Sequence, residues 1–385
     1  MPSKLEQALK VQGIYFDVTQ TSEPETFFWN AFLTVIAGDL RRLKNGAALR
    51  GIDLPTPSVA FTTDLDVNAF ADKIEDEYCI IINIGTVLVL QDVFNKIFSS
   101  KEAFPQYGDP SGERGAEVGI NPHIWDATTI LTNPTAGGSM PVDPIRATAA
   151  ALLTMLAIRF LALHEFGHIV NGHVDYRYSL GLGFRLNEVP RPEAASAFSP
   201  LDSQTLEMDA DAFATQFGLH SVLQAQTYGG KIFDLLARDK KEAVNLWHTA
   251  AHVFFRLFAN ARLESETLSE NTYPTFGARI IGHRSLIAEL LLNQVSPALR
   301  QELGIEGVSV VDVCQMSMAH FQSVERAFHE MHPAEYAAHA LDMYEAQIAE
   351  PEKQASAERL RHWGVLRPKL MRYAFGSETL APVQG

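Results

Sequence analysis

Two histidines and a glutamate within five residues carry the strongest chemical signal in this 385-residue chain. The stretch His164-Glu165-Phe166-Gly167-His168 spaces its imidazoles four residues apart, so on an α-helix they share one face, roughly 6 Å apart between Cβ atoms. Two imidazoles placed in this way can occupy two corners of a tetrahedral metal ion. Glu165 stands beside them, where its carboxylate can take a proton from a water on the metal. The spacing therefore predicts a hydrolytic zinc site.

The residues around this motif predict the helix that it needs. Residues 147–163 are rich in good helix formers and contain neither glycine nor proline. Asp143 followed by Pro144 is typical of a helix start, and Asn171-Gly172 is typical of a stop. The motif then falls in the last turns of a long, largely buried helix, where packing holds ligand side chains in place. The alternative is a pair of satisfied core histidines, which would leave a glutamate buried at considerable cost.

A third protein ligand is expected, because catalytic zinc sites use three and leave one position for water. Glu207 and Asp211 follow about forty residues later, four residues apart and so on one helix face. We expect Glu207 to reach the metal and Asp211 to accept a hydrogen bond from the outer nitrogen of a ligand histidine. Asp209, between them, is expected to point away, solvated or as a cap. The alternative is an acidic helix face in an acidic protein.

His173 competes with Glu207 for the third ligand position, because it follows His168 by five residues. A known three-histidine arrangement has a glycine three residues and a histidine six residues beyond the second histidine. Those positions hold Asn171 and Val174 here, so the register differs. A helix stop before His173 would also turn it away from the metal. We expect His173 to support the ligands from behind, with metal contact as the open alternative.

The two segments together resemble the gluzincin zinc metallopeptidases, which carry His-Glu-x-x-His on one helix and Glu-x-x-x-Asp on the next. Residues 165–173 and 209–214 are similar to soluble bacterial members, among them the phage-exclusion Lit-type peptidases. Residues 272–280 also resemble the Thr-His-Pro-x-x-x-x-Arg-Ile segment of HtpX-type enzymes, except that Tyr273 replaces the histidine. The resemblance covers roughly residues 145–290.

This resemblance implies a zinc endopeptidase acting on a specific intracellular protein. Zn²⁺ would be held by His164, His168 and Glu207, with Glu165 as the general base. A Lit-type enzyme would act in phage defence or stress, with cleavage triggered by an activating partner. Two alternatives stay open: a zinc-binding regulator with little or no turnover, and a helical structural protein with a fortuitous motif.

The negative tetrahedral intermediate of peptide hydrolysis needs a hydrogen-bond donor besides the metal. Three residues that follow the metal helices are candidates by position: Tyr273, Arg279 and His283. Each has an ordinary alternative, namely a turn for the tyrosine, an ion pair with the acidic helix for the arginine, and a surface position for the histidine.

Composition limits the partners and the compartment. The chain is 46% hydrophobic and 20% charged, as in ordinary soluble proteins, and its net charge of −15 argues against nucleic acid as a partner. Only Cys79 and Cys314 are present, which is too few for a disulfide framework and favours the cytoplasm. No apolar run of about 18 residues is uninterrupted, because Arg159 breaks the longest, so we expect no membrane span.

The whole pattern predicts an α+β fold that is predominantly helical. We expect an N-terminal α+β region with a long Gly/Pro-rich loop (1–140), a zincin-like catalytic core (141–295) and a helical C-terminal region (296–385). The N-terminal region would hold a small sheet.

Local sequence patterns also predict strands, a helix and a long loop. Residues 13–19 read as a strand, 23–43 as a helix, and 79–84 as a buried strand. Within the last, 80–84 is a candidate for binding extended substrate by edge pairing, with an ordinary core strand as the alternative. The Gly/Pro-rich stretch 104–144 is a candidate lid or a plain surface loop.

Two further stretches bear on the site. Residues 187–203 are expected to form substrate-pocket loops. His248 and His252 are four apart on a predicted helix, yet no acid follows the first, so we predict packed core histidines rather than a second metal face.

Overall fold

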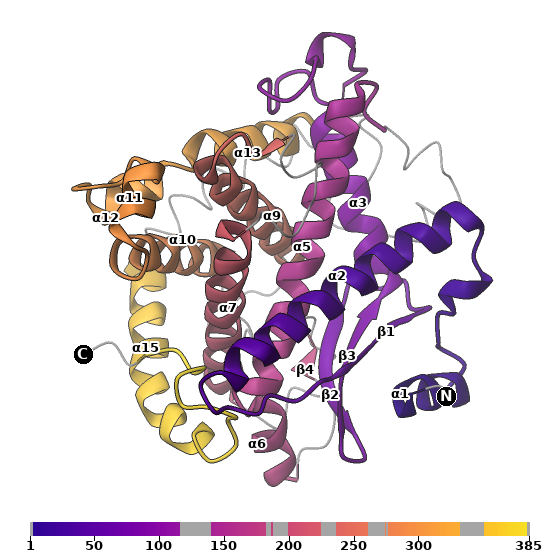
Figure 1. Ribbon diagram of the computed structural model, residues 1–385, viewed down its shortest axis with the longest axis vertical. Helices are drawn as coiled ribbons and strands as arrows, with labels where there is room; N and C mark the ends of the chain where they lie inside the picture. The colour runs from indigo at the N-terminus through magenta and orange to yellow at the C-terminus, as the bar shows by residue number, and fades with distance from the viewer. Residues whose placement is uncertain are drawn as a thin grey trace.

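The computed structural model describes residues 3–115, 140–181, 186–187, 199–224, 236–260, 274, 276–331 and 350–382. The chain is predominantly helical with one small sheet, which confirms the predicted α+β class (Figure 1). Most of the candidate lid, residues 116–139, and most of the candidate pocket loop, residues 188–198, lie outside the described residues. The division of the chain into three regions stays a prediction.

Helix α5 (Pro144–Val170) is the predicted metal helix and runs through the middle of the molecule (Figure 1). The Asp143 side chain caps it by accepting hydrogen bonds from the backbone N–H groups of the next turn. It ends just before Gly172, whose φ of 78° lies in the left-handed region that favours glycine. The predicted start, stop and burial of this helix are confirmed.

The start of α5 is also held by a buried arginine. Arg146 is fully buried, and its guanidinium donates to five backbone carbonyl oxygens, at 2.7–3.0 Å, in the segment between residues 98 and 107. A guanidinium offers five N–H donors in a planar fork, so a single side chain can satisfy a whole turn of carbonyl groups. The Glu113 carboxylate accepts from the backbone N–H groups of residues 142 and 143. These contacts fix where α5 enters the core.

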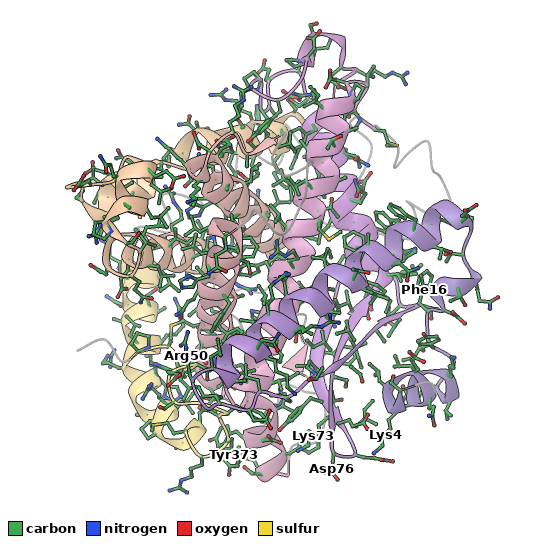
Figure 2. All side chains as sticks on the ribbon, viewed as in Figure 1. Lys4, Phe16, Arg50, Lys73, Asp76 and Tyr373 are labelled. Carbon is green, nitrogen blue, oxygen red and sulfur yellow. The ribbon has the colours of Figure 1, made fainter. Side chains whose placement is uncertain are left out.

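Other helices surround α5 on both sides (Figure 1). Those before it in the chain are α1 (Lys4–Val11), α2 (Glu23–Ala48) and α3 (Ile84–Ser99), with short 3-10 helices at Val18–Gln20 and Pro110–Gly112. Those after it are α6 (His173–Ser179), α7 (Pro200–Leu223), α9 (Lys240–Asn260), α10 (Phe276–Asn293), α11 (Pro297–Leu303), α12 (Val310–Gln315), α13 (Met318–Met331) and α15 (Glu350–Leu370). Side chains fill the space between these helices (Figure 2), and the main hydrophobic cluster draws on residues from Val18 to Met331.

The sheet contains β1 (Ser58–Thr62), β2 (Ala69–Ile74), β3 (Glu77–Asn83) and the two-residue β4 (Leu186–Asn187), in the order β1-β3-β2-β4. Strand β3 pairs in parallel with β1 and antiparallel with β2. Both of its edges are therefore hydrogen-bonded inside the sheet. The prediction that 80–84 binds substrate by edge pairing is wrong, because a central strand has no edge to offer.

The predicted strand at 13–19 is also largely wrong. Only an isolated antiparallel bridge joins Tyr15 to Thr62, and the chain then turns into a 3-10 helix at Val18. The Asp17 side chain accepts hydrogen bonds from both the backbone N–H and the hydroxyl of Thr19, at 3.0 and 2.6 Å. Such local side-chain bonds compete with a strand ladder and favour a turn.

Among the described residues, α5 is the one helix long and apolar enough to cross a membrane. Of its most apolar 18 residues, 78% are buried inside the protein. Arg159, which interrupts the apolar run, is buried against Asp39 of α2, with 2.6 Å between Nε and the carboxylate. Length and composition alone do not distinguish a core helix from a membrane span.

Candidate metal centre

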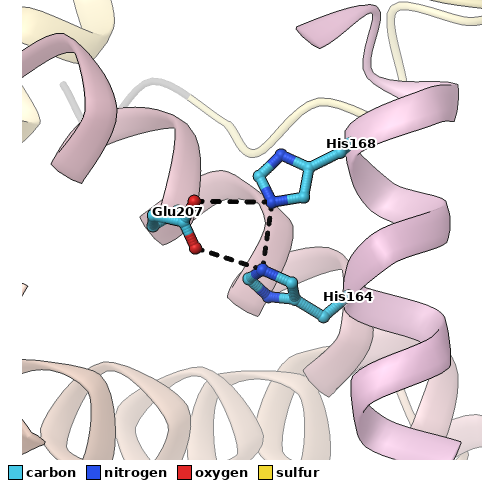
Figure 3. A group of neighbouring side chains, drawn as sticks. All are labelled: His164, His168 and Glu207. Carbon is cyan, nitrogen blue, oxygen red and sulfur yellow. Dashed lines mark hydrogen bonds and ion pairs between the residues drawn. The ribbon is translucent and has the colours of Figure 1, made fainter. Parts of the chain in front are cut away.

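Three predicted ligands converge in the core (Figure 3). His164 and His168 project from α5, and their Nε2 atoms lie 3.0 Å apart. Glu207 of α7 places one carboxylate oxygen 3.1 Å from Nε2 of His164 and the other 3.6 Å from Nε2 of His168. All three side chains are at most 3% exposed. Among the described residues, these three form the group whose ligand atoms are close enough to share one metal ion.

Small residues bring α5 and α7 close together. A Cβ added at Gly167 would lie 3.1 Å from Cβ of Phe213 on α7, which is tighter than an ordinary contact. Ala210 and Ala214 of α7 are fully buried. The glycine inside the His-Glu-x-x-His motif therefore lets α7 approach near enough for the Glu207 carboxylate to reach both imidazoles.

Asp211 supports His164 from behind, as predicted for a partner of a ligand histidine. Its Oδ1 lies 2.9 Å from Nδ1 of His164. Arg279 of α10 donates to both oxygens of the same carboxylate, at 2.8 and 2.7 Å. Burial raises the pKa of Asp211, but the charges and hydrogen bonds of Arg279 and His164 outweigh it and hold that pKa below its ordinary value. Asp211 is thus a buried carboxylate kept in its charged form.

His168 is supported by a longer chain of contacts. Its Nδ1 lies 2.9 Å from Nδ1 of His173, and Nε2 of His173 lies 3.1 Å from Oδ2 of Asp209. His173 therefore stands behind a ligand, as expected, and lies outside the three-residue metal group. Asp209 was expected to be solvated or a cap, and this is wrong, because its side chain is fully buried at the end of this chain of contacts.

The expectation for Asp209 failed because one helix was considered alone. On α7 Asp209 does face away from Glu207, but α5 ends at Gly172 and the chain turns back into α6. That turn brings His173 to the side of α7 on which Asp209 lies. The glycine stop was the available signal in the sequence, since it marks where the histidine leaves the direction of the metal helix.

The donor set fits a divalent cation. A carboxylate only accepts hydrogen bonds, so Asp211 makes Nδ1 of His164 a donor and leaves Nε2 as an acceptor. Burial is the largest cause that lowers the pKa of His168 well below 6.5, so that imidazole is neutral near pH 7. Two imidazole nitrogens and two carboxylate oxygens then face one point. A buried group of acceptors of this kind is what Zn²⁺ and similar ions bind.

The remaining predicted residues are placed as follows. Glu165 is 1% exposed on α5 beside the ligands. Arg279 is the ion-pair partner of Asp211, which was its ordinary alternative. His283 is 3% exposed and pairs through Nδ1 with the Thr215 hydroxyl at 2.8 Å, so the surface alternative for it is wrong. Tyr273 lies outside the described residues.

His248 and His252 of α9 are packed core histidines, as predicted. The His248 ring lies 5.0 Å from the ring of His283, and Nε2 of His252 lies 2.6 Å from a carboxylate oxygen of Glu325 on α13. Neither belongs to the group that could hold a metal within the described part of the chain.

A cavity of about 510 Å³ lies between α7, α10 and α15, and its lining is mostly apolar. Asp211, Arg279 and His283 line it, together with Trp363 of α15. The three candidate ligands do not contribute to its wall, so the cavity borders the support of His164 rather than the candidate metal position.

The fold and the site together define a helical α+β protein with a buried group of two histidines and one glutamate, carried on two adjacent helices. The model of one protein family, described as Peptidase U49, matches residues 122–294 of this chain. That range contains α5 and α7 and ends one residue after α10. The match supports a peptidase. Searches among curated proteins and among solved structures found no match.

Proposed function

We propose that the protein is a zinc-dependent endopeptidase that hydrolyses peptide bonds of a specific intracellular protein and acts in the cytoplasm. The observation that carries the proposal is the buried convergence of His164, His168 and Glu207 within a segment that matches a peptidase family. The two cysteines and the net charge of −15 support a cytoplasmic protein substrate over nucleic acid.

The chemistry follows from the residues present. His164, His168 and Glu207 would hold zinc, which when bound would lower the pKa of a water toward neutrality and polarise the scissile carbonyl. Glu165 takes the proton from the attacking water as the new C–O bond forms. Glu165 then delivers that proton to the leaving amine as the C–N bond breaks. Asp211 and Arg279 keep His164 oriented throughout.

The oxyanion donor and the trigger stay predictions. Arg279 donates hydrogen bonds to both oxygens of Asp211. Its contribution in this arrangement is therefore electrostatic, because it stabilises the carboxylate that orients His164. His283 and Tyr273 remain candidate hydrogen-bond donors to the oxyanion because of their positions in the sequence. An activating partner and a role in phage defence are proposed from the Lit-type resemblance.

Zinc content and two substitutions test the proposal. The purified full chain is expected to bind one zinc ion, measured by elemental mass spectrometry, and His168→Ala is expected to lose it. Glu165→Gln is expected to keep zinc and abolish cleavage, and Glu102→Gln, at an exposed position, serves as the matched control. New protein termini are then compared by proteomics in cells producing wild type or Glu165→Gln.

The outcomes separate the candidate functions. A chain without zinc would refute the metal centre. Termini that persist in Glu165→Gln would refute the general base. Zinc binding with no wild-type termini would favour the zinc-binding regulator, which the presence of a buried glutamate at position 165 disfavours.

A further inference from the structure

We propose that Asp209 is a positioning residue of the metal centre, which sets the orientation and tautomer of His168 through His173 and is itself locked by the C-terminal segment after α15. This inference rests on the proposed zinc centre. It concerns three links: Asp209 with His173, His173 with His168, and the C-terminal segment with Asp209.

The first two links determine which nitrogen of each imidazole carries the proton. Asp209 has only acceptor oxygens, so Nε2 of His173 donates to it across 3.1 Å. When the ring proton of His173 lies on Nε2, its Nδ1 is an acceptor, and Nδ1 of His168 is then the donor across 2.9 Å. This leaves Nε2 of His168 as an acceptor directed at Nε2 of His164 and the Glu207 carboxylate. Asp209 thus orients His168 for a metal without touching it, through the single intervening imidazole of His173.

Asp209 and Asp211 therefore play parallel parts on α7. Asp211 contacts His164 directly, whereas Asp209 reaches His168 through His173. The difference follows from where each histidine lies on α5. His164 lies in the body of α5, opposite α7, whereas His168 lies in its last turn, beside the point where the chain turns back into α6. One imidazole bridges that additional distance.

The third link comes from the end of the chain. Asp209 accepts from the Asn171 side-chain amide at 2.5 Å and from the backbone N–H of Ala381 at 2.7 Å. With His173, these donors engage both carboxylate oxygens of a fully buried acid. The Ala381 carbonyl in turn accepts from Trp363 and Arg367 of α15, each at 3.0 Å.

The C-terminal segment is seated tightly where it passes the end of α5. A Cβ added at Gly172 would lie 2.5 Å from the backbone of Tyr373, so this glycine permits the crossing. The backbone N–H of Phe375 donates to the carbonyl of Val170 at 2.9 Å. Tyr373 lies at the lower end of the molecule (Figure 2), with its ring 5.8 Å from that of Tyr176 on α6. Residues 373–381 are in this way part of the support of a proposed metal ligand.

The test compares variants of the full chain at each link. His173→Phe removes the acceptor and donor but keeps a ring, whereas His173→Gln restores both through an amide whose oxygen and nitrogen can take the two roles. Ala381→Pro removes the backbone N–H that Asp209 accepts and also fixes the local φ, and Pro382→Ala is its neighbour control. Two readouts are used: zinc affinity by competition with a chelator, and the histidine tautomers of the zinc-free protein by ¹⁵N NMR.

His173→Phe is expected to weaken zinc binding by roughly 10- to 100-fold and to leave His168 a mixture of tautomers, whereas the wild type shows the Nδ1-protonated form. His173→Gln should recover most of the affinity, and Ala381→Pro should lose roughly threefold or more while Pro382→Ala matches wild type. Unchanged affinity and an unchanged His168 tautomer in both His173→Phe and Ala381→Pro would overturn the inference. A wild type that binds no zinc would instead overturn the proposed function, and the tautomers would still decide the relay.

Discussion

Nε2 of His164 lies 3.0 Å from Nε2 of His168, and each imidazole is fixed from behind by a different acid of the same helix. Asp211 contacts the first histidine and Asp209 reaches the second through His173. The two nitrogens thus face each other as acceptors, beside the Glu207 carboxylate. A cation between them would relieve the repulsion of converging lone pairs and negative charge.

Replacing Glu207 tests this arrangement directly. Glu207→Ala removes one of three predicted ligands, so zinc affinity should fall by at least about 100-fold, because affinity depends on ligand count. The free energy of unfolding of the zinc-free protein should fall by much less than the free energy of zinc binding, or rise, because one buried carboxylate is gone. Chelator competition and urea unfolding measure the two quantities, and Glu102→Gln controls for an ordinary loss of charge. Equal zinc affinity in both variants would rule Glu207 out as a ligand.

Arg279 is predicted to stabilise the fold through Asp211. Arg279→Met leaves a buried carboxylate without its two-point partner, and such a loss costs about 3–5 kcal/mol of unfolding free energy. Arg279→Lys keeps the charge but not the planar fork, so its loss should be smaller. Urea unfolding of both zinc-free variants measures the difference. A methionine variant as stable as wild type would contradict the contact between this side chain and Asp211.

Gly167 is predicted to resist replacement by alanine. In a helix this change ordinarily stabilises by about 1 kcal/mol, and Gly282→Ala on α10 should show that gain, because a Cβ there meets nothing within 4 Å. At Gly167 the new methyl would press on Phe213 at 3.1 Å, at a cost of about 1–3 kcal/mol. Gly167→Ala should therefore be less stable than Gly282→Ala and bind zinc more weakly. If the two variants gain equally in thermal unfolding, the close helix contact is refuted.

His283 should make stability fall in mild acid. Burial is the main cause that lowers its pKa from 6.5 to about 3. The unfolded chain therefore takes up a proton below pH 6.5 that the folded chain refuses until about pH 3. Stability from this group is fully present above pH 6.5 and declines toward pH 3, by about 2 kcal/mol between pH 7 and pH 5.

Urea unfolding at several pH values checks this. His283→Gln should reduce the pH dependence by close to one proton between pH 6 and pH 4 while keeping a hydrogen-bonding partner for Thr215. His248, whose pKa burial also lowers, keeps its own share of the dependence in that variant. An identical slope in wild type and variant would show that His283 titrates normally in the fold.

Much of the site could be predicted from local patterns. The start of α5 at Pro144, its end before Gly172 and the shared face of its two histidines follow from capping chemistry and from the helical repeat. The spacing of Glu207 and Asp211 likewise predicts a common direction on the next helix. These are properties of residues within a few turns of one another, so neighbours along the chain decide them.

Such local patterns could not predict contacts between segments that are distant in the sequence. The apolar run in β3 predicts a buried strand, but only the pairing with both β1 and β2 shows that it has no free edge. Asp209 looks solvated on one helix, and only the return of α6 and the passage of Ala381 make it a buried acceptor. The sequence by itself determined the ligand-bearing helices, because hydrogen bonding and side-chain spacing act locally. Only the tertiary structure decided what stands behind each ligand, because a buried polar group takes its partners from whichever segments the packing of the core brings to it.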